Sequence, residues 1–229
     1  MSVVKALRAS VGAKAVMAVT GLFLLLFVLA HMLGNLQLFL GQDALNGYAA
    51  KLQSLGGLLW VARAGLLALL VAHVGAAVRL TYQNRRARPV PYAALTPQVT
   101  SYAARTMVMS GTVILAFAVY HLLHFTFGAT HPGHAALHDA QGRHDVYSMV
   151  VLGFQQAPVA VGYMLAQALL ALHLSHGASS LFQSLGVTHP ALRCLKDRAG
   201  PALALLIFVG NVSMPLACLL GWVGLPGGR

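Results

Sequence analysis

The chain has 229 residues, of which 58% are hydrophobic and only 8% are charged, and it carries a formal net charge of +11. Soluble domains usually contain about 25% charged residues, so this composition excludes a soluble globular protein and indicates an integral membrane protein. The positive charge would suit nucleic acid, but in membrane proteins Lys and Arg collect in cytoplasmic loops. We therefore expect a lipid bilayer, and not nucleic acid, as the partner.

Five apolar segments are each long enough to cross a bilayer, which takes about 20 residues. The sequence therefore predicts an all-α fold, a single membrane domain over residues 1–229 built as a bundle of five transmembrane helices. In chain order these helices are expected at about 15–40, 58–82, 106–128, 156–182 and 200–224.

The basic residues divide unevenly between the two sides of the membrane when the five segments alternate in direction. One side receives Lys5, Arg8, Lys14, Arg79, Arg85, Arg86, Arg88, Arg105, Arg193, Lys196 and Arg198. The other side receives Lys51, Arg63, Arg143 and Arg229. Because Lys and Arg favour cytoplasmic loops, we expect the N-terminus in the cytoplasm and the C-terminus outside.

Histidines recur inside the predicted helices, where a polar side chain is costly and marks a functional site. For one histidine alone, a hydrogen bond between helices is an equally good explanation, but each of the first four helices carries at least one. Imidazole binds Zn, Cu, Fe and Ni. Because no carboxylate lies within the helices, non-covalent haem with two histidine ligands fits better than a zinc or di-iron site. The helical histidines are His31, His73, His121, His124, His173 and His176, and those expected in solvated loops are His131, His134, His138, His144 and His189.

Four helices with histidines suggest two haems at two depths. At about 1.5 Å of rise per residue, His31 and His121 both fall in the outer half of the membrane and are expected to share an outer haem. His73 falls in the inner half on the second helix. The fourth helix, which runs in the same direction, offers His173 or His176 as its partner for an inner haem.

Local patterns choose between the neighbouring histidines. The segments "TGLFLLLFVLAHML" and "SGTVILAFAVYHLL" share a hydroxyl residue, then Gly, then Phe six residues and His ten residues after the Gly. This register selects His121 over His124. Small residues surround His73 in "AHVGAAV" and His176 in "SHGASSL", and they select His176 over His173, although depth alone slightly favours His173. The two histidines left out, His124 and His173, are expected to line the same pockets or to donate hydrogen bonds to haem propionates.

The chain resembles the five-helix, two-haem cytochrome b membrane anchor of succinate:quinone oxidoreductases and fumarate reductases (respiratory complex II). The resemblance covers nearly the whole chain and is most specific in the last of its four segments, "GAKAVMAVTGLFLLLFVLAHMLGNL", "SYAARTMVMSGTVILAFAVYHLLHF", "DVYSMVVLGF" and "HLSHGASSLFQSLG". It implies axial ligands at His31, His73, His121 and His176, paired as His31/His121 and His73/His176. It also implies a flavoprotein and an iron–sulfur protein on the cytoplasmic face, a quinone (expected to be menaquinone) as redox partner, and the cytoplasmic membrane of a prokaryote as the location.

The resulting expectation is an electron-transfer subunit of succinate dehydrogenase or fumarate reductase that holds two haems b, with succinate chemistry in the partner subunits. Arg63 on the outer side and Arg105 on the inner side are candidates to bind haem propionates, although ordinary flanking anchors explain them equally well. One alternative is the haem b anchor of a hydrogenase or formate dehydrogenase. Another is a His-lined metal or proton transporter, but transporters usually carry inverted repeats, broken helices and membrane carboxylates.

Overall fold

The structure is a computed structural model that describes residues 10–87, 102–184 and 193–227, so Lys5, Arg8, Arg88, His189 and Arg229 lie outside the described residues. It contains five helices long and apolar enough to cross a membrane. The all-α prediction and the five spans are therefore confirmed for the described part of the chain. The long helices are α2 (Ser10–Asn35), α4 (Gly57–Arg86), α6 (Met107–His121), α9 (Ala157–Ser184) and α10 (Arg193–Leu219).

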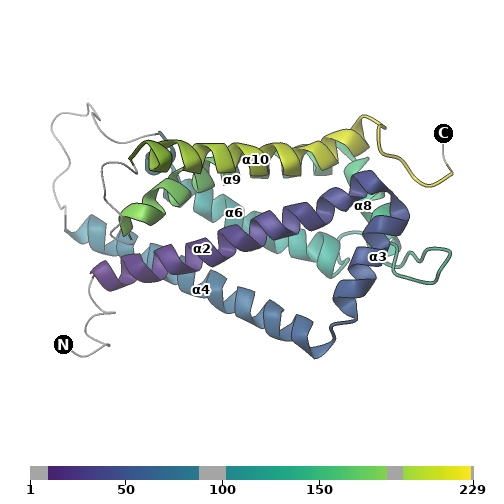
Figure 1. Cartoon of the computed structure of the whole chain (residues 1–229), viewed down its shortest axis with the longest axis horizontal. Coiled ribbons are helices and arrows are strands. Elements are labelled where there is room, and N and C mark those ends of the chain that lie inside the picture. Colours follow the sequence, from purple (N-terminus) through teal and green to yellow (C-terminus); the bar gives the residue numbers. More distant parts are fainter. Residues whose placement is uncertain (1–9, 88–101, 185–192, 228–229) are drawn as a thin grey trace.

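The five long helices form one bundle (Figure 1). Helix α2 packs against α4, α6 packs against α9, and α10 packs along α9. Glycines permit two of the close approaches, because a Cβ at Gly200 would collide with Ser179 of α9 and a Cβ at Gly210 would collide with Met32 of α2. Helices α2 and α6 run in one direction and α4 and α9 run in the other. This is the alternation expected from the sequence.

One end of the bundle, which we call the loop end, carries short helices that the sequence did not predict. These are α3 (Gln42–Gln53), α7 (Pro132–Ala135) and α8 (Val146–Phe154). Helix α8 begins at an Asp145 N-cap, whose carboxylate accepts the backbone N–H of Ser148 at 3.1 Å. The connection between α2 and α3 is the short helix η1 (Leu36–Leu40).

The loop end is held together around Asn46 of α3, which is fully buried. Its side-chain amide donates to Asp145 Oδ1 at 2.9 Å and to Asp139 Oδ2 at 3.1 Å, and its oxygen accepts the Tyr147 N–H at 2.9 Å. Arg143 adds ion pairs to Asp139 and Asp43, both at 2.8 Å. These bonds tie α3 to the loop that precedes α8.

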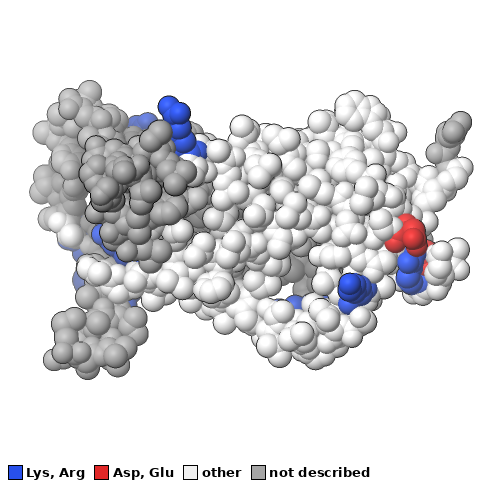
Figure 2. All heavy atoms as spheres, viewed as in Figure 1, with Lys and Arg blue, Asp and Glu red and all other residues white. Residues whose placement is uncertain are grey.

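The opposite end, which we call the basic end, carries Lys14, Arg79, Arg85, Arg86, Arg105 and Arg198. Figure 2 shows blue atoms of Lys and Arg at both ends, red atoms of the acids at the loop end, and a largely uncharged band between the ends. Every acid whose side chain the structure describes lies at the loop end. The charges therefore flank an apolar middle, as expected of a membrane-spanning bundle. The side of the membrane that each end faces remains a prediction.

Two helices depart from their expected boundaries. The fifth begins at Arg193 and not near residue 200, so that Pro201 and Pro215 both lie inside α10. The third span passes from α6 into a π-helical turn, η2 (Leu122–Thr126), in which the Phe127 N–H bonds the Leu122 carbonyl at 2.8 Å. A π turn holds one extra residue and often marks a functional position; this one carries His124.

Candidate functional site

The six helical histidines form two clusters at different depths in the bundle. The loop-end cluster consists of His31 of α2 with His121 and His124 of the third span. The basic-end cluster consists of His73 of α4 with His173 and His176 of α9. This division agrees with the two depths expected from the sequence.

His31 and His121 lie side by side in the loop-end cluster. Their ring centroids are 5.8 Å apart and their planes are nearly perpendicular at 88°. An imidazole nitrogen binds a metal ion at about 2 Å, so two imidazoles on opposite sides of one ion have centroids roughly 6 Å apart. One turn before each histidine, a phenylalanine ring lies beside it: Phe27 is 5.3 Å from His31 and Phe117 is 6.0 Å from His121. The pair is thus spaced for two ligands of one ion.

His124 is enclosed by protein, in contrast with the exposed His31. Only 2% of its surface is exposed, and its ring stacks on Phe125 at a centroid distance of 3.9 Å. The edge of the ring lies against α8, where a Cβ at Gly153 would come within 3.1 Å of it. Its Nδ1 is 3.0 Å from the Tyr163 hydroxyl. This packing leaves no open face for a planar ligand.

In the basic-end cluster, His73 is held by two adjacent residues of α2. Its Nδ1 is 3.1 Å from Thr20 Oγ1, and the Thr20 hydroxyl itself donates to the Val16 carbonyl at 2.7 Å. The Thr20 oxygen therefore accepts from His73 Nδ1–H. The lone pair on His73 Nε2 is then free to bind a metal ion. Gly21 lies against the same ring, since a Cβ there would be 3.1 Å from His73 Cε1.

His173 is held in the same way by two adjacent residues of α6. Its Nδ1 is 3.3 Å from Ser110 Oγ, and the Ser110 hydroxyl donates to the Met107 carbonyl at 3.2 Å. A Cβ at Gly111 would be 3.3 Å from His173 Cε1. The α6–α9 pair thus repeats the α2–α4 pair.

His176, the expected partner of His73, is not held by this arrangement. It is half-buried one turn further along α9, and the hydroxyl and glycine of α6 contact His173. The sequence contained a signal for the contact with His173. A hydroxyl residue followed by Gly begins both of the matching segments, as Thr20–Gly21 in one and Ser110–Gly111 in the other.

The donor set decides which group these histidines fit. Among the described residues no group of three or more His, Cys, Asp or Glu side chains converges as a bare metal ion requires. What the structure offers is imidazoles from different helices at each of two depths, with glycines beside His73 and His173. Such pairs fit haem iron, because the porphyrin supplies the remaining four ligands.

The two arginines expected to bind propionates lie on the surface of the chain. The Arg63 guanidinium sits over the Trp60 ring, 4.9 Å from its centroid, near the start of α4. Arg105 ends the short helix α5 (Tyr102–Arg105). Both side chains are exposed, and their role toward a cofactor remains a prediction.

The loop histidines are more ordered than the sequence suggested. The His131 and His134 rings stack at 5.1 Å, and His131 Nε2 is 3.2 Å from Gln156 Oε1. Burial and the neighbouring His131 lower the pKa of His134. Two further loop histidines, His138 and His144, line a separate pocket.

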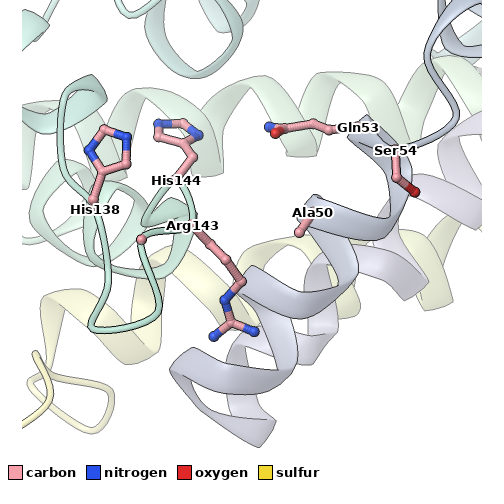
Figure 3. Close-up of a pocket in the computed structure, with 7 residues that line it drawn as sticks. Ala50, Gln53, Ser54, His138, Arg143 and His144 are labelled. Atoms are coloured by element: carbon pink, nitrogen blue, oxygen red, sulfur yellow. The ribbon is translucent and has the colours of Figure 1, made fainter.

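That pocket, of about 440 Å³, lies at the loop end between α3 and the loop before α8 (Figure 3). Gln53 and Ser54 line one side, and His138, Arg143 and His144 line the other. Each of the two imidazoles bonds a backbone carbonyl. The Arg143 charge is already balanced by its ion pairs, so the pocket presents no free charged group that would select a ligand.

Comparisons with known proteins add no assignment: neither a protein-family model, nor a curated protein, nor a solved structure matches this chain.

Proposed function

We propose that this chain is the di-haem cytochrome b membrane anchor of a succinate:quinone oxidoreductase, a succinate dehydrogenase or fumarate reductase. The observation that carries the proposal is the repeat of one histidine arrangement on two helix pairs. His73 meets Thr20 and Gly21, and His173 meets Ser110 and Gly111. The close pair of rings in the loop-end cluster adds a second site of the same kind.

We assign the axial positions to the pairs His31/His121 and His73/His173. The first pair is the one expected from the sequence. The second replaces His176 by His173, because the Ser110 bond gives His173 the Nδ1–H tautomer that leaves Nε2 free for iron. Arg63 and Arg105 stay as candidate propionate partners.

Each residue of the site has a physical task. The Thr20 and Ser110 hydroxyls orient the imidazoles of the basic end, and the glycines let a flat macrocycle approach the helix backbone. Phe27 and Phe117 pack beside the loop-end histidines and restrict how the two imidazoles can turn. When bound, two haems with both axial positions filled supply one-electron transfer and no oxygen binding.

The partners follow from the same proposal. A flavoprotein and an iron–sulfur protein dock on the cytoplasmic face, which we assign to the basic end, and membrane quinone, expected to be menaquinone, is the redox partner. The location is the cytoplasmic membrane of a prokaryote. A metal or proton transporter is less well supported, because transporters usually carry carboxylates inside the membrane, whereas Asp43, Asp139 and Asp145 all lie outside the apolar spans.

Purification of the chain with its co-migrating subunits tests the proposal directly. A pyridine haemochrome assay is expected to give about two haems b per chain, and the complex is expected to reduce quinone with succinate. A colourless protein, or one that carries a single haem, contradicts it. A red protein without succinate or fumarate activity points instead to the anchor of another quinone-linked enzyme.

Cysteine labelling tests the assigned direction. In a Cys194→Ala background, Ala87→Cys lies just beyond α4 at the basic end and Ala140→Cys lies in the loop before α8. An impermeant reagent added to intact cells is expected to label position 140 and not position 87. The opposite pattern reverses the topology.

A further inference from the structure

Tyr163 of α9 lies between two histidines of the loop-end cluster. Its hydroxyl oxygen is 3.0 Å from His124 Nδ1 and 3.4 Å from His121 Nδ1. A phenol has one O–H to donate and lone pairs to accept. The Tyr163 O–H can donate to only one of these nitrogens, so at least one of the two histidines donates to the Tyr163 oxygen.

Binding of iron by His121 decides the direction of the hydrogen bond between His121 and Tyr163. This step rests on the proposed function, in which His121 binds iron through Nε2. A neutral imidazole that ligates through Nε2 carries its proton on Nδ1. His121 then donates to the Tyr163 oxygen, and Tyr163 donates to His124 Nδ1. We infer that Tyr163 is the positioning residue for His121, and that His124 is the acceptor that fixes the direction of the Tyr163 O–H.

The packing around this chain of hydrogen bonds holds it in one arrangement. Tyr163 is 5% exposed and meets Phe117 and Phe154 edge-on at 4.9 and 5.0 Å. His124 is buried against Phe125, and its Nε2 has no hydrogen-bond partner within the described residues. The assignment places the single N–H proton of neutral His124 on that Nε2. It also explains why His124 belongs to the cluster without offering a ligand.

The same device recurs at the basic end with smaller residues. Thr20 accepts from His73 and Ser110 accepts from His173, so each of the assigned ligands His73, His173 and His121 donates its Nδ1–H to a hydroxyl oxygen. His31 makes no hydrogen bond with any side chain that the structure describes. Within the loop-end pair, Tyr163 therefore acts on His121 alone.

The redox potential of the loop-end haem is the property that Tyr163 changes. A hydrogen bond from a ligand N–H to an acceptor makes the ligating nitrogen more basic, which favours ferric over ferrous iron. Tyr163→Phe removes the acceptor and keeps the aromatic ring. In the purified complex we expect two haems per chain, a positive shift in one of the two midpoint potentials, and no change in the other.

Two further variants sharpen the test. Tyr120→Phe is the matched control, because its ring is 5.9 Å from Tyr163 and 5.6 Å from His124, while its hydroxyl bonds no histidine in the described part of the chain. It is expected to shift neither potential. His124→Phe removes the acceptor of the Tyr163 O–H and is expected to shift the same potential in the same direction by less.

Three results overturn the inference. The first is an unchanged pair of potentials in Tyr163→Phe, and the second is an equal shift in Tyr120→Phe. The third is loss of a haem from His124→Phe while Tyr163→Phe keeps both, which makes His124 a ligand. Each variant is compared with a wild-type protein that contains two haems. A wild type without them contradicts the proposed function itself.

Discussion

The two histidine clusters differ in how the chain holds its imidazoles. At the basic end, His73 and His173 are each fixed by a hydroxyl and a glycine that are neighbours in sequence on one facing helix. At the loop end, phenylalanines flank His31 and His121, and the hydroxyl on His121 comes from Tyr163 on a third helix. The first arrangement is encoded by two adjacent residues. The second exists only when three helices have packed.

This difference also separates the clusters in their surroundings. The basic-end rings sit against small residues, where helix backbones approach closely. The loop-end rings sit in an aromatic layer that continues into the buried core of α8 and the polar network around Asn46. Changes at the basic end should therefore act locally, whereas changes at the loop end should also disturb the fold.

The largest effect is expected from the basic-end ligands. His173→Ala is expected to remove one of two haems per chain, because it deletes an assigned axial ligand. His176→Ala is the matched control on the same helix and is expected to keep both. Pyridine haemochrome content and the low-spin spectrum give the readout. Loss of a haem from His176→Ala alone would make His176 the ligand, as the sequence predicts. The α6–α9 pair would then not repeat the α2–α4 arrangement.

Glycine substitution comes next. Gly21→Ala places a Cβ 3.1 Å from His73 Cε1, so the ring must move and haem affinity at the basic end is expected to fall by on the order of tenfold. Gly65→Ala on α4 meets no atom within 4 Å and is expected to leave both haems in place, with a gain in helix stability of up to about 1 kcal/mol. Haem titration of the two variants compares them, and equal affinities would show that the glycine contact is immaterial.

A smaller effect, confined to the loop end, is expected from Asn46→Ala. Loss of its side chain leaves the buried Tyr147 N–H unpaired and removes one of the donors to Asp145, and we expect a loss of about 2 kcal/mol in stability. Asn84→Ala, at an exposed position of α4, is the control and should lie within about 0.5 kcal/mol of wild type. Thermal unfolding measures both. An unaltered basic-end haem spectrum in Asn46→Ala is part of the expectation.

The smallest effect is a pH dependence at the loop end. Burial acts to raise the pKa of Asp139, but hydrogen bonds from Asn46 and Arg143 prevail and hold it at about 2, below its ordinary 3.8. Because the folded pKa is the lower one, the stabilisation is complete above about pH 4 and is lost as the pH falls toward 2. Limited proteolysis between pH 5 and 2 measures this loss, and cleavage of the loop is expected to increase as the pH falls. Asp139→Asn should remove that pH dependence. A loop that opens above pH 5 contradicts the assignment.

The spans and the closeness of His31 to His121 could be predicted because both depend on local patterns. Hydropathy defines a helix, and a repeated Gly-to-His spacing sets the depth. Small neighbours in the sequence favour His176, whereas the contacts of Ser110 and Gly111 with His173 form only when α6 packs on α9. Tyr163 gave no signal at all, since its role depends on the packing of α9 against the third span.

The loop end was harder to predict for the same physical reason. Helix α3 is amphipathic and polar, so hydropathy reads it as a loop, and it is held by Asn46, whose partners lie about a hundred residues further along the chain. Helix α8 is apolar but too short to span a membrane. Both need tertiary contacts that no local pattern contains.

The π-helical turn η2 bears on how this chain should be aligned with others. It inserts one residue between His121 and the end of the third span, and an α-helix turns by about 100° per residue. Deleting one residue within Leu122–Thr126 would leave His121 in place and rotate everything after it, Phe127 included, away from its present neighbours. Chains that share the histidine at the end of α6 but lack the contact between His124 and Tyr163 should therefore align with a one-residue gap at this turn.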